Sequence, residues 1–172
     1  MRNLIIGNIL SFIAAVFLGI SCYAKDRKKI FTYQLVNCAT YTVASYFFGT
    51  YAAITTLIFC CIRSILIMKD RYTSTAAYIL VIAVIAFGIM ANNRGIVGLL
   101  PVIASVVYNL CCYYITDPHL TRYSILINEL IWVTYAFIIK DFSTGISDTI
   151  IIIVDITAII HYHNKLSTEN IL

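Results

Sequence analysis

Long apolar runs alternate with short polar breaks along the whole chain. Seven runs approach the ~20 residues that a helix needs to cross the hydrocarbon core of a bilayer. Turn signals fill the breaks, such as Asn92-Asn93-Arg94-Gly95 and the Gly49-Thr50 pair. The predicted spans are 4–24, 30–48, 51–68, 75–91, 96–115, 123–139 and 146–162. We therefore predict an all-α, polytopic membrane protein. The last two runs are short, which leaves a re-entrant segment after Lys140 as an alternative.

Composition supports the membrane reading. Hydrophobic residues make up 61% of the 172 positions and charged residues 12%, with a mean hydropathy of +0.90. Soluble domains are nearer half apolar and a quarter charged. We expect the lipid bilayer as the solvent of this chain, with every span satisfying its own backbone hydrogen bonds. The net charge of +4 lies in the short breaks, so nucleic acid is not an expected partner.

The basic residues are distributed unequally between the two sides of the predicted bundle. With the N-terminus outside, the inner loops and tail hold Lys25, Arg27, Lys28, Lys29, Lys69, Arg71, Arg122 and Lys165. The outer side holds Arg2, Arg94 and Lys140. The positive-inside rule then predicts an outside N-terminus and a cytoplasmic C-terminus.

The layout of the first three spans recurs in the last three. An offset near 91 residues aligns Asn37 with Asn128 and Tyr41 with Trp132. We predict one membrane domain: a three-helix repeat at 1–74, a linker helix at 75–95, a second three-helix repeat at 96–163 and a tail at 164–172. The inserted linker keeps both repeats in the same orientation, about an axis along the membrane normal, with a site between them.

The paired positions are the candidate substrate ligands. Asn37 and Tyr41 are one helical turn apart, as are Asn128 and Trp132. Carboxamides offer both donors and acceptors, and aromatic faces stack on sugars or heteroaromatic rings. The alternative for each residue is plain helix packing, in which Asn bonds to a neighbouring helix.

Three ionisable residues lie inside apolar runs. Arg63, Glu129 and Asp155 fall roughly 8–11 Å above the inner boundary at 1.5 Å per residue. Such groups usually face the protein interior and pair with one another. We therefore expect Arg63 to pair with Glu129, Asp155 or both, as an inner gate or in proton coupling. A purely structural ion pair is the alternative. Pro101, near the start of its span, is a candidate hinge.

Catalytic, metal and cofactor chemistry are not indicated. The six cysteines fall inside apolar runs, where free cysteine behaves as a small buried side chain. Zinc spacing, a phosphate loop and a nucleophile with a base and an acid are absent from the sequence. We expect no enzyme activity, no bound metal and no cofactor.

Three short motifs carry a family resemblance. Gly49-Thr50-Tyr51, Ile62-Arg63 and the segment from Leu99 to Ile103 resemble the YgjV-type bacterial inner-membrane proteins. The resemblance covers roughly 8–160. Its layout is similar in turn to the three-plus-one-plus-three helices of SWEET sugar facilitators, PQ-loop transporters and PnuC vitamin-precursor transporters. It implies a site lined by facing asparagines and aromatic residues.

Two functions follow from these patterns. The first is a facilitative small-molecule transporter for a small polar or ring-containing metabolite that binds between the two repeats. The second is a non-transporting membrane protein: a partner subunit, or a lipid or signal binder. A hydrated cavity lined by the paired positions favours the first, and a wholly apolar repeat interface favours the second.

Overall fold

A computed structural model describes residues 2–24 and 26–169, and in this part of the chain every regular element is helical. Lys25 of the first basic loop and residues 170–172 of the tail lie outside the described residues. The helices are α1 (Arg2–Tyr23), α2 (Arg27–Phe48), α3 (Tyr51–Met68), α4 (Ser74–Met90), the 3₁₀ turn η1 (Val97–Leu99), α5 (Leu100–Tyr114), α6 (Pro118–Ile139) and α7 (Phe142–Glu169). The all-α prediction is confirmed.

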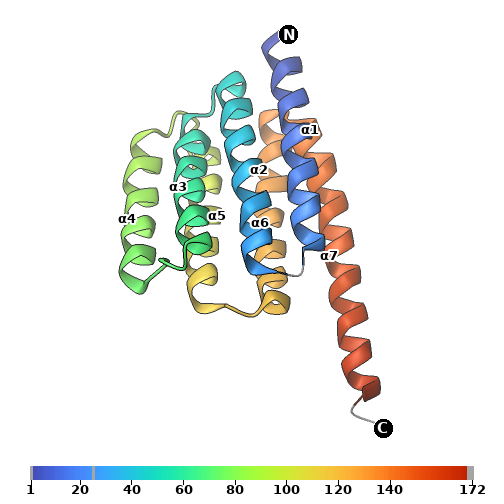
Figure 1. Cartoon of the computed structure of the whole chain (residues 1–172). Helices are drawn as coiled ribbons and strands as arrows, with labels where there is room; N and C mark the ends of the chain where they lie inside the picture. Colours follow the sequence, from blue (N-terminus) through green and yellow to red (C-terminus); the bar gives the residue numbers. More distant parts are fainter. Residues whose placement is uncertain (1, 25, 170–172) are drawn as a thin grey trace.

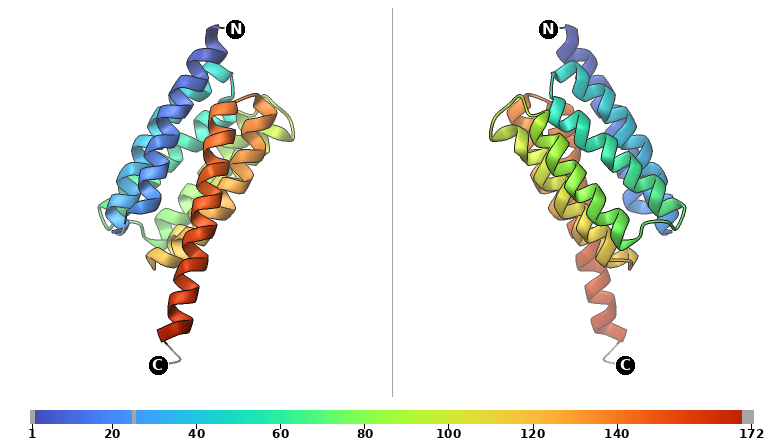
Figure 2. Two further views of the ribbon diagram at one scale, coloured as in Figure 1. Left: turned by 90° about the vertical axis from the view of Figure 1, so that its right-hand side faces the viewer. Right: turned by 90° about the vertical axis from the view of Figure 1, so that its left-hand side faces the viewer.

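The helices form two layers (Figures 1 and 2). Helix α2 packs between α1 and α3 in one layer, and α6 packs between α5 and α7 in the other. The layers meet at two seams, α1 with α7 and α3 with α5, and α4 covers the edge beside α3 and α5. The central helices α2 and α6 are not among the closely packed pairs, so side chains fill the space between them.

Four segments of the described chain are long and apolar enough to cross a membrane. They are Arg2–Tyr23, Tyr51–Met68, Val97–Tyr114 and Leu120–Ile139, and α4 is a shorter apolar helix. Crossing by α2, α4 and α7 stays a prediction. The two ends of the chain lie at opposite ends of the bundle (Figure 1). Helix α7 is continuous through the segment after Lys140, so the backbone there follows the helical alternative and not a re-entrant loop.

Helix boundaries repeat at the offset found in the sequence. Helices α2 and α6 begin 91 residues apart and end 91 residues apart, and both have 22 residues. Helices α3 and α7 begin 91 residues apart, and α1 and α5 end 91 residues apart. This coincidence supports the predicted repeat. The seams agree with it, because the third helix of each three-helix unit packs on the first helix of the other unit: α3 on α5, and α7 on α1.

The turns before α3 and α7 have the same geometry. Gly49 and Lys140, again 91 apart, both adopt the left-handed conformation, with φ of 65° and 66°. Each donates its backbone N–H to the carbonyl three residues earlier, and the next residue, Thr50 or Asp141, bonds to the carbonyl five residues earlier. A left-handed residue ends a helix by satisfying its last carbonyls. The turn therefore needs a backbone conformation that suits Gly49 and strains Lys140.

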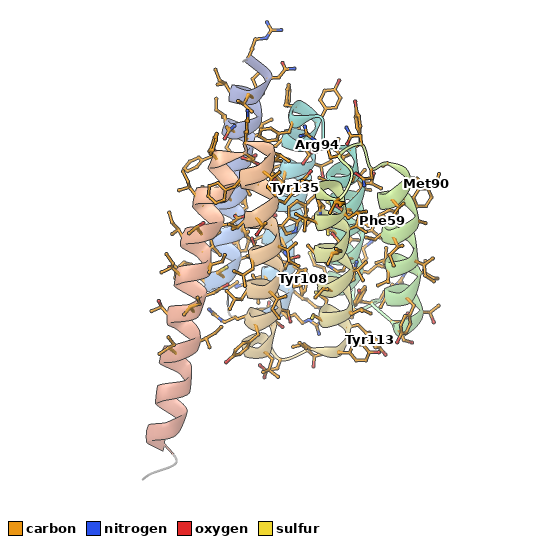
Figure 3. All side chains as sticks on the ribbon, turned by 180° about the vertical axis from the view of Figure 1, so that it is seen from behind. Phe59, Met90, Arg94, Tyr108, Tyr113 and Tyr135 are labelled. Carbon is orange, nitrogen blue, oxygen red and sulfur yellow. The ribbon has the colours of Figure 1, made fainter. Side chains whose placement is uncertain are left out.

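The outer surface of the bundle is apolar. Ile5, Ile9 and Phe12 on α1, and Ile82 and Met90 on α4, are more than half exposed. Figure 3 shows Met90 at the edge of the bundle, whereas Tyr108 and Tyr135 belong to the layer of α5, α6 and α7, which faces the viewer there. A soluble monomer rarely exposes such a large contiguous apolar surface. This belt is the surface that contacts lipid.

Candidate functional site

A cavity of about 50 Å³ lies between the two layers. Its walls come from α1, α2 and α3 on one side and α5, α6 and α7 on the other. A buried water needs roughly 10–15 Å³ measured in this way, so the space suits about three to five waters. All four candidate substrate ligands from the sequence line it: Asn37, Tyr41, Asn128 and Trp132. The structure brings them together, and their role as substrate ligands stays a prediction.

Aromatic rings form the wall between α2 and α6. Tyr41 meets Trp132 edge-on at 5.6 Å between ring centroids, and Trp132 meets Tyr135 at 5.7 Å. All three side chains are buried. The hydroxyl groups of Tyr41 and Tyr135 have no hydrogen-bond partner. Of these two tyrosines, Tyr41 lines the cavity, so its hydroxyl group is available to a polar ligand or to water there.

The two asparagines occupy different environments. Asn37 donates from Nδ2 to the carbonyl of Ala14 at 2.9 Å, which ties α2 to α1. Asn128 donates from Nδ2 to Oε1 of the adjacent Glu129 at 3.1 Å. One hydrogen bond of Asn37 thus holds two helices together, which is the packing role that the sequence left open as an alternative. Asn128 instead orients a carboxyl group at the cavity wall.

Two acidic side chains share the cavity. Glu129 of α6 and Asp148 of α7 both line it and are 4% and 3% exposed. The two side chains come from neighbouring helices and bring two carboxyl groups to one wall of the cavity. Two carboxyl groups at one wall favour the presence of a proton or of a cationic donor.

Arg63 is the cation of the cavity. It is 1% exposed, and its guanidinium carbon lies 4.4 Å from the ring centroid of Tyr108 on α5. Tyr108 in turn exchanges hydrogen bonds with Gln34 of α2, at 2.8 and 3.1 Å. This contact joins the two layers below the aromatic wall. Nε and Nη1 of Arg63 have no hydrogen-bond partner.

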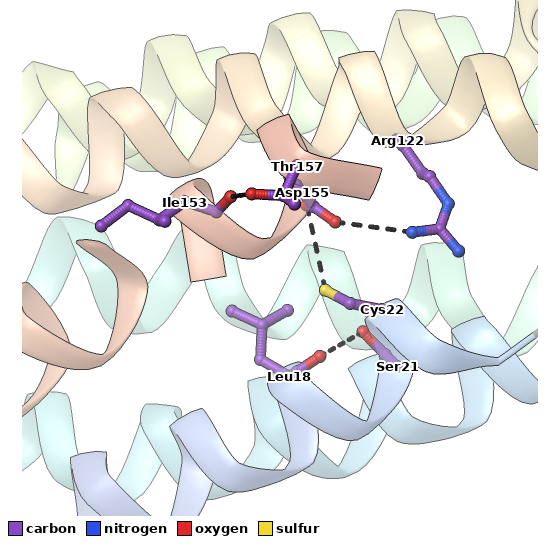
Figure 4. Close-up of polar contacts among 7 residues, drawn as sticks. All are labelled: Leu18, Ser21, Cys22, Arg122, Ile153, Asp155 and Thr157. Carbon is purple, nitrogen blue, oxygen red and sulfur yellow. Dashed lines mark hydrogen bonds and ion pairs between the residues drawn. The ribbon is translucent and has the colours of Figure 1, made fainter. Parts of the chain in front are cut away.

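The predicted pairing of Arg63 with Asp155 is wrong. Asp155 faces the α1–α7 seam, where Oδ1 lies 3.8 Å from Nη1 of Arg122, and Cys22 donates its S–H to Oδ2 at 3.9 Å (Figure 4). In the described part of the chain, no carboxylate comes within 4.0 Å of Arg63 either, so its pairing with Glu129 is also not formed. Equal depth did not imply proximity because α3 and α7 do not pack together.

Asp141 closes the end of the cavity nearer the N-terminus. Its carboxylate accepts from the Thr144 N–H, which caps α7, and from the Ser11 hydroxyl at 2.8 Å. Asn8 accepts from the Ser143 N–H at 3.0 Å. Burial raises the pKa of Asp141, while these hydrogen bonds oppose the shift. The α1–α7 seam is thus firmly bonded at this end.

Other bonds close both ends of the bundle. Near the N-terminal end, Arg94 donates to the carbonyl of Phe48 at 2.8 Å, which anchors the loop before α5. Near the other end, Arg27 donates to the carbonyl of Cys112 at 2.7 Å and so links α2 to α5. Pro101 lies in the first turn of α5, directly after η1. A proline there removes no helical hydrogen bond, and its hinge role stays a prediction.

Sequence reasoning missed several members of the site. Gln34 lies one turn before Asn37 and Cys38 on the same face of α2, so the spacing that marked Asn37 and Tyr41 also marks it. Asp141 stands in a polar turn, where nothing in the sequence separates it from its neighbours. Tyr108 gives no signal among 13 tyrosines. Among the described residues, no group of three or more His, Cys, Asp or Glu is placed to hold a metal ion.

The family model Imp-YgjV, described as bacterial inner membrane protein, matches residues 5–165, and the chain belongs to this family. No curated protein and no solved structure matches it. The family and the apolar helices identify a multi-pass protein of the bacterial inner membrane that contacts the lipid bilayer. The orientation of its termini stays a prediction.

Proposed function

We propose that this member of the Imp-YgjV family is a facilitative small-molecule transporter that binds a small polar metabolite between its two layers. One observation carries the proposal: polar and aromatic side chains from six of the seven α-helices of the described chain converge on one cavity. A bundle with only a packing role gains nothing from buried carboxyl, guanidinium and carboxamide groups around an open space, because each is costly to bury.

The structure resembles a closed state in a transport cycle. A cavity of about 50 Å³ is far below the 300–1,000 Å³ typical of ligand pockets. A substrate therefore enters only when a seam between the layers opens. Rocking of two similar units about a midplane site is the general mechanism of transporters built from repeats. The α1–α7 and α3–α5 seams are where such a motion would occur.

The α1–α7 seam is bonded unequally at its two ends. At the N-terminal end, Asp141 accepts from Ser11 at 2.8 Å. At the other end, the thiol of Cys22 on α1 lies 3.9 Å from the carboxylate of Asp155 on α7. Arg122, 3.8 Å from the same carboxylate, is on α6 and holds Asp155 within its own layer. A thiol is a weak hydrogen-bond donor. We propose that the contact of Cys22 with Asp155 is the gate that opens first, on the predicted cytoplasmic side.

Proton coupling is a subsidiary proposal. It rests on Glu129 and Asp148, two buried carboxyl groups that line the same cavity as the proposed substrate ligands. Collapsing the pH gradient across vesicles is expected to slow uptake if the proton moves with the substrate. Uptake that is unchanged by that treatment would exclude coupling and leave a facilitator.

A non-transporting membrane protein is the second candidate function. The bond from Asn37 to the Ala14 carbonyl favours it, because that contact is complete without a ligand. So does the small size of the cavity. In this reading the protein is a partner subunit or binds a lipid or signal, and the buried polar groups only set helix register.

Ligand-dependent stability separates the two candidates. The purified protein would be heated with a panel of sugars, nucleosides, vitamins and amino acids, since a ligand stabilises the state that it binds. We expect a specific hit that is lost in Asn128→Ala and Trp132→Ala and kept in Phe137→Ala, a control whose side chain is 45% exposed on the same helix. A well-folded protein with no hit across the panel would favour the second candidate.

A further inference from the structure

The guanidinium of Arg63 lacks a counter-ion. It is 1% exposed and lines the cavity, and its Nε and Nη1 atoms have no hydrogen-bond partner. The described residues place no carboxylate within 4.0 Å of it. An arginine presents five N–H donors and stays charged under all ordinary conditions. Burying such a charge without a partner costs several kcal/mol.

The surroundings of Arg63 supply partial compensation only. The ring face of Tyr108 lies 4.4 Å from the guanidinium carbon, a cation–π contact. The titratable neighbours are Cys60, Cys112 and Cys38 together with that phenol. Thiols and phenols are neutral in their usual state. A thiolate at Cys60 is the rival counter-ion, and the experiment below separates it from a ligand.

An acidic group faces the same cavity from the other layer. Counted from the N-terminal end of the bundle at 1.5 Å per residue, Asp148 is about 9 Å deep, Glu129 about 15 Å and Arg63 about 18 Å. The cavity therefore has an acidic upper wall on α6 and α7 and a cationic lower wall on α3. A ligand that satisfies both walls carries an oxyanion at one end and a cationic or hydrogen-bond-donating group at the other.

We propose that Arg63 binds the carboxylate of a small amphoteric acid, of the amino-acid type, whose amino group faces Glu129 and Asp148. Arginine suits this role because its planar fork matches a carboxylate in a bidentate manner. The size agrees, since room for about three to five waters corresponds to the smallest such acids. This inference rests on the proposed function, because it names the substrate class of the same cavity.

Trp132 provides the readout, since it is the single tryptophan of the chain and lines the cavity. Its fluorescence and the melting temperature of the purified protein would be followed while glycine, L-alanine or L-serine is added. L-alaninamide, which lacks the carboxylate, propionate, which lacks the amino group, and inorganic phosphate are the matched probes. We expect L-alanine to change both signals, propionate to act weakly, and L-alaninamide and phosphate to have no effect.

Variants assign the effect to Arg63. Arg63→Gln is expected to weaken L-alanine binding about ten- to a hundredfold, the loss that follows removal of a charge-assisted hydrogen bond. Arg63→Lys keeps the charge and should retain part of the affinity for L-alanine. Comparison of the two variants therefore separates loss of the charge from a folding defect in Arg63→Gln. Cys60→Ala should leave the affinity unchanged. The exposed Arg71 supplies the control variant Arg71→Gln.

Four results would overturn the assignment. Equal responses to L-alaninamide and L-alanine would show that the carboxylate is not recognised. An Arg63-dependent response to phosphate alone would make the site an inorganic-anion site. Loss of binding in Cys60→Ala but not in Arg63→Gln would give the role to the thiol. Transport of a neutral metabolite without any acid binding would refute this inference and keep the proposed function. Binding of the acid without transport would refute the proposed function and keep the assignment of Arg63.

Discussion

The phenol of Tyr41 meets the indole of Trp132 edge to face, with the ring planes at 70° and the centroids 5.6 Å apart. The two residues belong to α2 and α6, the central helices of the two layers, whose backbones are not closely packed together. This ring contact therefore spans the cavity between the layers. A ligand that enters between them must displace or tilt one of the rings.

Trp132 substitutions should separate stability from ligand binding. Trp132→Phe keeps an aromatic ring against Tyr41 and Tyr135 and should cost about 1 kcal/mol of unfolding free energy, because aromatic pairs contribute about 0.5–1.5 kcal/mol each. Trp132→Ala should cost about 3–5 kcal/mol, because it removes both ring pairs and leaves a cavity. Phe137 is 45% exposed and its ring packs on Gly145 of α7, so Phe137→Ala should cost only about 1 kcal/mol. Denaturant unfolding in detergent measures all three. Equal losses for Trp132→Ala and Phe137→Ala would contradict the contact.

Lys140→Gly should stabilise the protein. Lys140 adopts a φ of 66°, and the left-handed conformation costs a residue with a Cβ roughly 1–2 kcal/mol. Glycine removes most of that strain but gains freedom in the unfolded chain, so a net gain of about 0.5–1 kcal/mol is expected. The matched change Gly49→Ala, at a φ of 65°, should destabilise by a similar amount. Thermal unfolding of the two variants tests the pair, and shifts of the same sign would refute the shared turn geometry.

Asp141 should give stability a measurable pH dependence. Burial raises the pKa of its carboxyl group above the ordinary value of 3.8, so the folded state holds the proton more tightly than the unfolded state. The contribution of this carboxyl group to the free energy of unfolding is then largest below pH 3.8. It falls as the pH rises toward and through the folded-state pKa. Asp141→Asn keeps a good helix cap and lacks the titration. Its advantage in melting temperature over the natural protein should grow from about pH 4 to about pH 7, and a constant difference would contradict the shift. Ser11→Ala removes a hydrogen bond to the charged carboxylate. It should therefore make the melting temperature depend more steeply on pH.

Cys22 should report opening of the proposed gate. Its thiol is buried beside Asp155, at 3.9 Å from Oδ2. In a variant whose other five cysteines are replaced by alanine, Asp155→Asn should weaken the contact with Cys22 across the α1–α7 seam and raise the rate of labelling by a membrane-impermeant maleimide. The rise should occur in inside-out vesicles, if this end is cytoplasmic. Ser21→Ala beside it, whose hydroxyl bonds only within α1, is the control. Equal rates in both variants would argue against a gate at this position.

Most helix positions could be predicted from the sequence because an apolar run of fixed length has few alternatives in a bilayer. Segment 51–68 was placed with its observed bounds. Helices α2, α6 and α7 start three to five residues before the predicted positions, because capping groups lie upstream of their apolar runs. Asp26 accepts from the Lys28 N–H and starts α2 at Arg27, and Asp117 accepts from the Leu120 N–H before α6. Helix α7 continues past the predicted 162 to Glu169, because nothing in its polar tail breaks a helix.

The site could be predicted only in part. Residues matched by the repeat, such as Asn128 and Trp132, reach the same cavity because equivalent positions on α2 and α6 face each other. The partner of Arg63 could not be found in this way, since depth along a helix gives height and not direction. Arg63 faces Tyr108 of α5, whereas Asp155 faces Arg122 of α6 and Cys22 of α1. Those directions depend on which helices are neighbours, and the apolar pattern does not encode that.

Counterflow in proteoliposomes tests the transport proposal most directly. Vesicles that hold the purified protein would be loaded with each unlabelled metabolite of the panel and diluted into a trace of its labelled form. We predict saturable, transient accumulation for a specific metabolite. It should be abolished in Asn128→Ala and Trp132→Ala, kept in Phe137→Ala, and absent from empty vesicles. If the protein is folded, binds a ligand by Trp132 fluorescence and still moves none of the panel across the membrane, the account of this cavity as a transport site is contradicted.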